Sequence, residues 1–221
     1  SGAGAVYMGF GTFNARRNAQ GFSHEEMADA IAYCRARNVK SNITLNILVG
    51  DRELEDALED AKFLYEAGAD ALIVQDLGLA RLIHAHAPDF ALHASTQMTI
   101  HTLDGAKQAR DIGFSRVVLS RECSREEIKL ITEQAGVETE VFVHGALCFC
   151  YSGQCYMSAL IGRRSGNRGA CAQPCRMQYS MGGRMDEYPL SLRDNCLADY
   201  LQQLEDAGVA CVKIEGRMKR P

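Results

Sequence analysis

One pattern recurs along this chain: a glycine closes an amphipathic segment, and a short apolar run follows the glycine. The pattern occurs as SGAGAVYMG, EAGADALIVQD, DIGFSRVVLSRE, QAGVETEVFVHG and DAGVACVKIEG. Glycine directly after a helix supplies the left-handed conformation that caps it, and runs rich in Val, Ile and Leu are typical of strands buried on both faces. Helix and strand therefore alternate, which predicts an α/β fold with a parallel sheet.

The way in which this sheet closes can be inferred from the ends of its strands. The apolar runs predict seven strands, at residues 5–9, 43–49, 71–75, 91–97, 116–120, 139–144 and 209–215. An open doubly wound sheet would place its site behind a glycine-rich first turn, and no G-x-G-x-x-G follows any of these runs. Instead, polar residues end nearly every run, as at the C-terminal mouth of a (β/α) barrel. We therefore predict a TIM-type (β/α) barrel.

Both ends of the chain affect this prediction. The first run has the form of a helix end followed by a strand, and the last run is followed only by GRMKRP. We expect residues 1–221 to form a single barrel domain, a fragment that lacks the first strand-helix unit and the last helix. A cysteine-rich loop and a hairpin are expected at about 145–193, between the last two strands.

The composition of the chain indicates its cellular compartment and limits the kinds of binding partner to expect. The formal net charge of -4 argues against a protein that coats nucleic acid non-specifically, although a local basic patch is compatible with it. No apolar run approaches the length of a membrane span, and the first residues lack the charged region of a signal peptide. We expect a cytoplasmic protein without membrane contact. A reducing compartment favours metal ligation or catalysis over disulfides for its cysteines.

Five of the nine cysteines lie between Cys148 and Cys175, in a glycine-rich polar segment directly after the strand that ends at His144. Such a loop turns tightly enough to aim several thiolates at one ion. The candidate ligands follow a C-x6-C-x15-C-x3-C spacing and are Cys148, Cys155, Cys171 and Cys175. Four thiolates suit structural zinc or an iron-sulfur cluster, and the spacing leaves this choice open. Cys150 is a conceivable alternative ligand. The other cysteines are expected to pack as small apolar residues: Cys34, Cys123, Cys196 and Cys211.

Polar residues at the strand ends are the candidates for chemistry. Glu122, His144 and Glu215 are the candidate acid-base groups, because a strand end at the barrel mouth lies near a bound substrate. The candidate substrate-binding residues are amides and cations that suit polar or anionic groups: Asn46, Gln97, Arg121, Arg164, Arg168, Lys213 and Arg217. Each of these residues has a structural alternative as a hydrogen-bond partner or a solvated charge.

A protease constellation is hard to find in the sequence. It contains no G-x-S-x-G nucleophile elbow and no H-E-x-x-H zinc helix. A dyad of Cys148 with His144 is conceivable, because both residues belong to one strand end. If Cys148 binds a metal or cluster, however, it is not a free nucleophile.

The segment EVFVHGALCFCYSGQCYMSALIGRRSGNRGACAQPCR resembles the signature of the peptidase U32 family of collagenase-like proteins, and FNAR, HASTQM, VVLSRE and VKIEGR resemble its other recurring segments in the same order. The resemblance implies a barrel. It also maps the family's cluster ligands onto the four candidate cysteines, which favours a 4Fe-4S cluster over zinc. Some members have been called proteases, whereas others are iron-sulfur proteins that hydroxylate RNA bases or ubiquinone precursors without molecular oxygen.

The resemblance implies three possible functions. The first is an oxygen-independent RNA hydroxylase that acts on a tRNA uridine, with a prephenate-like small molecule as the oxygen donor and with a further domain or partner subunit as a source of specificity. The second is a collagenase-like peptidase. The third is a non-catalytic partner subunit in which the cluster only staples the loop. We expect the first of these.

Overall fold

The computed structural model describes residues 2–15 and 21–215, apart from the side chains of 181 and 184–186. The parallel strands run in the order β1-β2-β3-β4-β5-β6-β10, and they are β1 (Ala5–Gly9), β2 (Lys40–Leu45), β3 (Ala71–Val74), β4 (Ala91–Ala94), β5 (Arg116–Val118), β6 (Glu138–Gly145) and β10 (Cys211–Ile214). Strands β7 (Tyr179–Met181) and β8 (Arg184–Glu187) form a separate hairpin, and β9 (Asn195–Cys196) pairs antiparallel with β6.

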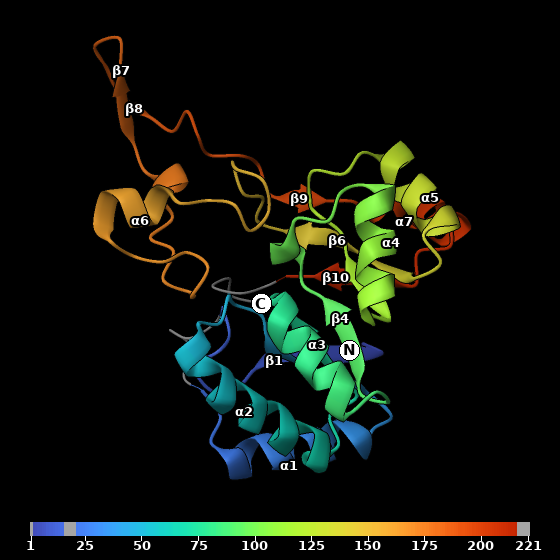
Figure 1. Cartoon of the computed structure of the whole chain (residues 1–221). Coiled ribbons are helices and arrows are strands. Elements are labelled where there is room, and N and C mark those ends of the chain that lie inside the picture. Colours follow the sequence, from blue (N-terminus) through green and yellow to red (C-terminus); the bar gives the residue numbers. More distant parts are fainter. Residues whose placement is uncertain (1, 16–20, 216–221) are drawn as a thin grey trace.

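Helices alternate with these strands and cover one face of the sheet, apart from α6, which lies out on the connection between β6 and β9 (Figure 1). They are α1 (His24–Arg35), α2 (Leu54–Ala67), α3 (Leu77–His86), α4 (Leu103–Ile112), α5 (Arg125–Gln134), α6 (Met157–Gly162) and α7 (Leu201–Asp206). Short 3-10 turns complete the fold: η1 (Asp51–Glu53), η2 (Thr96–Met98), η3 (Pro174–Arg176) and η4 (Ala198–Tyr200). Ser23 and Ser124 begin α1 and α5 with complete capping boxes, each formed with the glutamate three residues later.

The predicted strands are confirmed, but two of them end well before the expected residue. The fourth strand was expected at 91–97 and ends at Ala94, before η2. The second strand was expected at 43–49 and instead spans Lys40–Leu45. The backbone beyond it bonds to side chains rather than to a neighbouring strand, because the Asn46 carbonyl accepts a hydrogen bond from Gln97 and the Val49 amide donates one to Asp76. The two-residue strand β9 was not predicted, since so short a run carries no period in the sequence.

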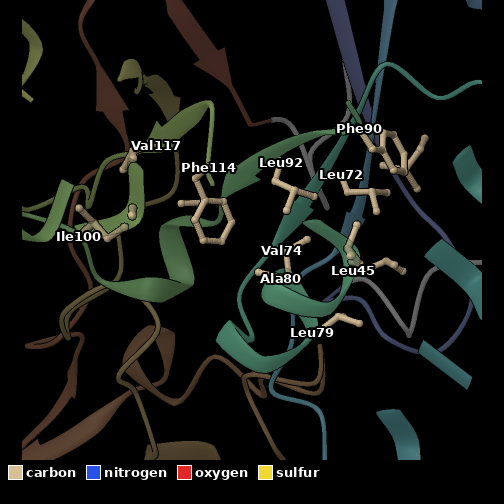
Figure 2. Packing of buried hydrophobic residues seen from close by; sticks show 14 of the residues in the cluster. Leu45, Leu72, Val74, Leu79, Ala80, Phe90, Leu92, Ile100, Phe114 and Val117 are labelled. Atoms are coloured by element: carbon tan, nitrogen blue, oxygen red, sulfur yellow. The ribbon is translucent and has the colours of Figure 1, made fainter. Parts of the chain in front are cut away.

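The two faces of the sheet have different roles, and the side chains alternate between them. Leu45, Leu72, Val74 and Leu92 lie on the outer face and pack with the α3 residues Leu79 and Ala80 in the buried core (Figure 2). Burial of each such leucine contributes about 1.5–3 kcal/mol to folding. Side chains of the inner face line a cavity instead, and they include Tyr7, Thr44, Ile73, Val118, Phe142 and Lys213.

The result is a curled, parallel-dominated sheet with helices outside and a lined interior, which is consistent with a partial TIM-like barrel. In the described residues β1 and β10 are the two edges of the parallel path. They approach one another through the interior, where the Lys213 Nζ atom lies 4.2 Å from the centroid of the Tyr7 ring. Between residues 2 and 215, as far as they are described, no helix has the length and apolar character to cross a membrane.

Candidate functional site

A cavity of about 200 Å³ lies inside the curled sheet, toward the C-terminal ends of its parallel strands. Its walls come from residues directly after β2, β4, β5 and β10 and from the long connection between β6 and β9, residues 146–194, which we call the cysteine arm. Many of the predicted site residues contribute to these walls, namely Asn46, Gln97, Arg121, Lys213, Glu215, Cys148, Cys155 and Cys171. The expected location of the site at this end of the strands is therefore supported by the geometry.

A buried ion-pair cluster forms the floor of the cavity. The Lys213 Nζ atom donates to Oε1 of Glu140 at 2.8 Å, and Arg116 contacts the other carboxylate oxygen of Glu140 at 3.3 Å. Burial acts to raise the pKa of Glu140, but the charges and hydrogen bond of its cationic neighbours, led by Lys213, lower it overall. His93 lies in the same cluster, and burial followed by the charge of Arg116 lowers its pKa to about 4. Of these side chains, Lys213 is the one that lines the cavity, and His93, which is neutral at neutral pH, lies behind it.

A second ion pair closes the side of the cavity near β10. Arg121 donates to Oε2 of Glu215 at 2.5 Å, and the two side chains are 12% and 19% exposed. The Arg121 guanidinium also lies 3.9 Å from the centroid of the Phe142 ring, which fixes its plane. Glu215, a predicted acid-base residue, is therefore held as a carboxylate partner of Arg121 inside the cavity wall.

An amide cluster ties the cysteine arm to the strand ends. The Asn167 Nδ2 atom donates to Oε1 of Gln75 at 2.6 Å and to Oε1 of Gln97 at 2.8 Å. Gln97 in turn donates to the carbonyl of Asn46 at 2.7 Å, and Asn167 accepts from the Leu48 amide at 3.1 Å. Asn167 is the key residue that sequence reasoning missed. No local signal identifies it, because its partners lie 70 and 92 residues away.

Some predicted site residues instead hold the cysteine arm in place. Glu122 accepts hydrogen bonds from the amide and hydroxyl of Ser152 at 2.7 and 3.0 Å. Arg168 makes a two-pronged ion pair with Glu53, with N–O distances of 2.8 and 2.6 Å. In the structure these two side chains hold the arm in place, and the catalytic role of Glu122 and the substrate-binding role of Arg168 stay predictions.

The remaining predicted residues are placed as follows. Arg164 is exposed on the arm, where its Nε atom donates to the carbonyl of Ala170 at 3.0 Å. His144 is exposed on β6 opposite Cys196 of β9, and among the described residues it does not belong to the cavity wall. Arg217 lies outside the described residues.

The predicted cysteine ligands gather on the arm beside the cavity. Burial raises the pKa of the Cys148 thiol, Arg121 acts in the opposite sense, and the nearby Cys175 and Cys171 raise it further. The Cys171 sulfur accepts a hydrogen bond from the Gln173 amide at 3.3 Å. Amide donors directed at a cysteine sulfur are typical of the surroundings of iron-sulfur clusters.

The predicted cysteine ligands and the amide donor beside them thus suit a thiolate-bound cluster, but the side chains are not arranged around one metal site. Within the described part of the chain, no group of three or more His, Cys, Asp or Glu side chains is arranged to hold a metal ion. Burial and the neighbouring Cys155 raise the pKa of the thiol of Cys150, the conceivable alternative ligand, which therefore stands beside the predicted set. The cluster and its four ligands remain a prediction.

One cysteine was assigned wrongly. Cys196 was expected to pack as a small apolar residue, yet it is exposed, whereas Cys34, Cys123 and Cys211 are partly buried. The cause is its position on β9, a two-residue addition to the end of β6 that no helix covers. Its thiol is therefore at the same strand end from which the cysteine arm departs.

The arm docks through a glycine that tolerates no side chain. Gly153 has a φ of +79°, and a Cβ atom there would collide with the backbone carbonyl of Gln97. Gly183, in the β7–β8 turn, has a similar φ of +80° with nothing within 4 Å of the added atom. An alanine at either position therefore has the same unfavourable left-handed conformation, and the alanine at position 153 also collides with Gln97.

We expect Gly153→Ala to lower the free energy of unfolding by about 1–3 kcal/mol more than Gly183→Ala does, because the collision is with backbone that has little freedom to move. The left-handed alanine itself costs about 1–2 kcal/mol in either variant. Urea denaturation of both variants and the wild type measures the difference. Equal losses in the two variants would show that the arm does not rest on η2.

Comparison with known proteins gives this geometry a context. The family model described as "Peptidase family U32" matches residues 1–221. The 23S rRNA 5-hydroxycytidine C2501 synthase of Escherichia coli is 43% identical over 99% of this chain and 34% of its own length. The tRNA hydroxylation protein P1 of Bacillus subtilis is 33% identical over 99% of this chain and 54% of its own length.

A relative with a different name matches over a similar range. A protein of Porphyromonas gingivalis named collagenase is 32% identical over 100% of this chain and 58% of its own length. The chain thus spans well under two thirds of each of these relatives. The solved structure of the U32 peptidase Mk0906 superposes with a TM-score of 0.68 and 13% identity, covering 100% of this chain and 87% of that one. At that identity the superposition shows the fold alone, and it agrees with the barrel-like architecture.

Proposed function

Since the chain belongs to the peptidase U32 family, we propose that the protein is an iron-sulfur enzyme that hydroxylates a pyrimidine base of RNA without molecular oxygen. One observation carries the proposal. A single small cavity is lined by three predicted cluster ligands and, on its other walls, by the Arg121–Glu215 pair and the Lys213 ammonium. Redox-capable ligands and charged binding groups therefore face the same space.

The size of the cavity favours a small planar substrate over a peptide. Sites for drug-sized ligands measure about 300–1,000 Å³, and this cavity measures about 200 Å³. Enzymes that modify a base take it out of the stack and read it with hydrogen bonds in a close pocket. Asn46, Ser95 and Gln97 bring amide and hydroxyl groups to the cavity wall, where they hydrogen-bond one another, and a bound base edge would exchange with these bonds.

Each group in the cavity has a proposed role. The cluster, held by Cys148, Cys155, Cys171 and Cys175, would supply the electron-transfer chemistry. Arg121 and Lys213 would bind the carboxylates of a prephenate-type oxygen donor, since charge-assisted hydrogen bonds to carboxylates are strong. Glu215, held beside Arg121 at 2.5 Å, is the proposed acceptor for a proton. A cytoplasmic location, which keeps thiols reduced, accompanies this proposal.

The class of RNA is the finer part of the proposal. The relatives above are named for a cytidine of 23S rRNA and for tRNA, and our prediction is a tRNA uridine. Mass spectrometry of nucleosides from separated rRNA and tRNA, in cells with and without the gene, tests both. We expect one hydroxylated pyrimidine to disappear from one fraction. Identical profiles in both fractions would contradict the proposal.

The peptidase alternative has weaker geometric support. Its catalytic dyad would need Cys148 and His144, and only Cys148 belongs to the cavity wall within the described residues. The non-catalytic alternative gives no role to the charged groups that line the cavity. Both alternatives remain distinct outcomes of the measurements described below.

A further inference from the structure

We propose that the outer face of the cysteine arm is the docking surface for the RNA strand that flanks the target base. This inference rests on the proposed function, and it specifies where the RNA binds outside the cavity. Figure 1 shows the arm, with α6 and the β7–β8 hairpin, extending away from the helices α4 and α5 that cover the body. Three features of the arm support this surface, namely its charge, the orientation of α6 and the exposed rings beside the cavity.

The charge of the arm is opposite to that of the rest of the chain. Residues 146–185 contain no Asp or Glu, and their five arginines are Arg163, Arg164, Arg168, Arg176 and Arg184. With Arg193 and the acidic Asp186, Glu187 and Asp194 at its end, the whole arm carries 6 - 3 = +3, so the rest of a chain with net charge -4 carries -4 - 3 = -7. A concentrated cationic segment on an acidic protein is the electrostatic footprint of a polyanion-binding surface.

Helix α6 links this surface to the cavity. Ser158 points inward, since it is 3% exposed, lines the cavity and accepts a hydrogen bond from the Ala172 amide at 3.0 Å. Leu160 follows about half a helical turn later, and it is 85% exposed. Tyr156, four residues before Leu160, shares this outer face and is 63% exposed. One side of α6 therefore faces the reaction space and the other faces solvent.

Exposed aromatic rings lie along the path from the cavity to α6. Tyr151 lines the cavity yet is 61% exposed, which places it at the opening. Its ring centroid lies 6.0 Å from that of His101. Tyr156 directly follows Cys155, another residue of the cavity wall. Aromatic side chains beside cationic ones are platforms on which successive bases stack, whatever the base sequence.

The arginines of the arm divide into two sets. Arg168 binds Glu53, and Arg176 donates to the backbone carbonyls of Leu147 and Leu192, so both stabilise the arm itself. Arg163 and Arg164 come directly after α6 and are exposed, although Arg164 also uses its Nε atom for the carbonyl of Ala170. Their position beside Tyr156 and Leu160 assigns the phosphate contacts to this pair. A protein partner would instead use the apolar Leu160 and Ile161, and it would not require the excess of cations.

The experiment measures binding of a fluorescein-labelled, single-stranded, pyrimidine-rich RNA to the anaerobically purified protein across a salt series. For Arg163→Gln/Arg164→Gln we expect about tenfold weaker binding and a salt slope that is shallower by about 1.4, at about 0.7 per phosphate contact. For Tyr156→Ala we expect at least about fivefold weaker binding with an unchanged salt slope, because stacking releases no counterions. Unchanged iron content and thermal stability show that the variants fold.

The matched control is Arg125→Gln/Lys129→Gln, which removes two exposed cations from α5 and is expected to bind as the wild type does. Wild-type affinity and salt slope in the Arg163/Arg164 variant would overturn the docking surface. So would a variant that binds RNA normally but no longer retains a polypeptide that co-purifies with the wild type. Binding through the arm without any gene-dependent nucleoside would support the surface and refute the proposed reaction. A gene-dependent nucleoside, together with normal RNA binding by the Arg163/Arg164 variant, would support the proposed reaction and refute the docking surface.

Discussion

Protein that carries Cys171→Ser is expected to lose its iron and its acid-labile sulfide, whereas anaerobically purified wild-type protein is expected to be brown and to contain both. Cys171 lines the cavity, its sulfur accepts an amide hydrogen bond, and its charge acts on the Cys148 thiol. Serine keeps the shape of the side chain but is a much poorer ligand for iron than a thiolate. Metal and sulfide analysis together with the visible absorption spectrum measures the loss.

The control for this prediction is Cys34→Ser, which removes a partly buried cysteine from α1, on the helical side of the fold. It is expected to retain iron and sulfide at the wild-type level. Stoichiometric zinc in the wild-type protein would contradict the cluster. Full iron content in Cys171→Ser would remove this residue from the ligand set.

The second large effect is expected from Lys213→Met, which deletes the ammonium group at the cavity floor. Lys213 is 8% exposed and Glu140 is 2% exposed, so the variant leaves a buried carboxylate whose ion pair with Arg116 is longer, at 3.3 Å. Removal of one partner from a buried pair costs about 3–5 kcal/mol. Chemical denaturation is expected to show a loss in this range.

A double variant separates the lost charge from lost packing. Glu140→Gln added to Lys213→Met removes the stranded carboxylate, and we expect it to recover a large part of the lost stability, because the two residues form one interacting pair. A loss below about 1 kcal/mol in Lys213→Met would mean that Arg116 alone satisfies Glu140. A double variant no more stable than the single one would attribute the loss to packing.

Much of the fold could be predicted from the sequence because its signals are local. The capping boxes at Ser23 and Ser124, and the glycine caps before the strands, lie within a few residues of the elements that they define. Polar residues at the strand ends located the cavity, because parallel strands bring their C-terminal ends together. The ends of β2 and β4 were exceptions, since side chains from other elements end β2 and the 3-10 turn η2 follows β4.

The candidate site was harder to predict because its contacts join distant parts of the chain. Glu122 and Arg168 have the chemistry of site residues, yet each anchors the arm to partners that are 30 and 115 residues away. Asn167 carries no signal in its own neighbourhood. Cys196 is exposed because it lies on β9, a strand of only two residues. In each case the deciding contact is a tertiary one, which residue type and spacing do not encode.

The central claim is that this cavity hydroxylates an RNA base with the help of a cluster. Its most direct test is to complement a deletion strain with the wild-type gene or with Cys155→Ser and to quantify the hydroxylated nucleosides of its rRNA and tRNA. We predict that the wild-type gene restores one hydroxylated pyrimidine and that Cys155→Ser, which removes a predicted ligand from the cavity wall, does not. The claim is contradicted if no nucleoside depends on the gene while purified wild-type and Cys155→Ser proteins cleave collagen or casein at the same rate.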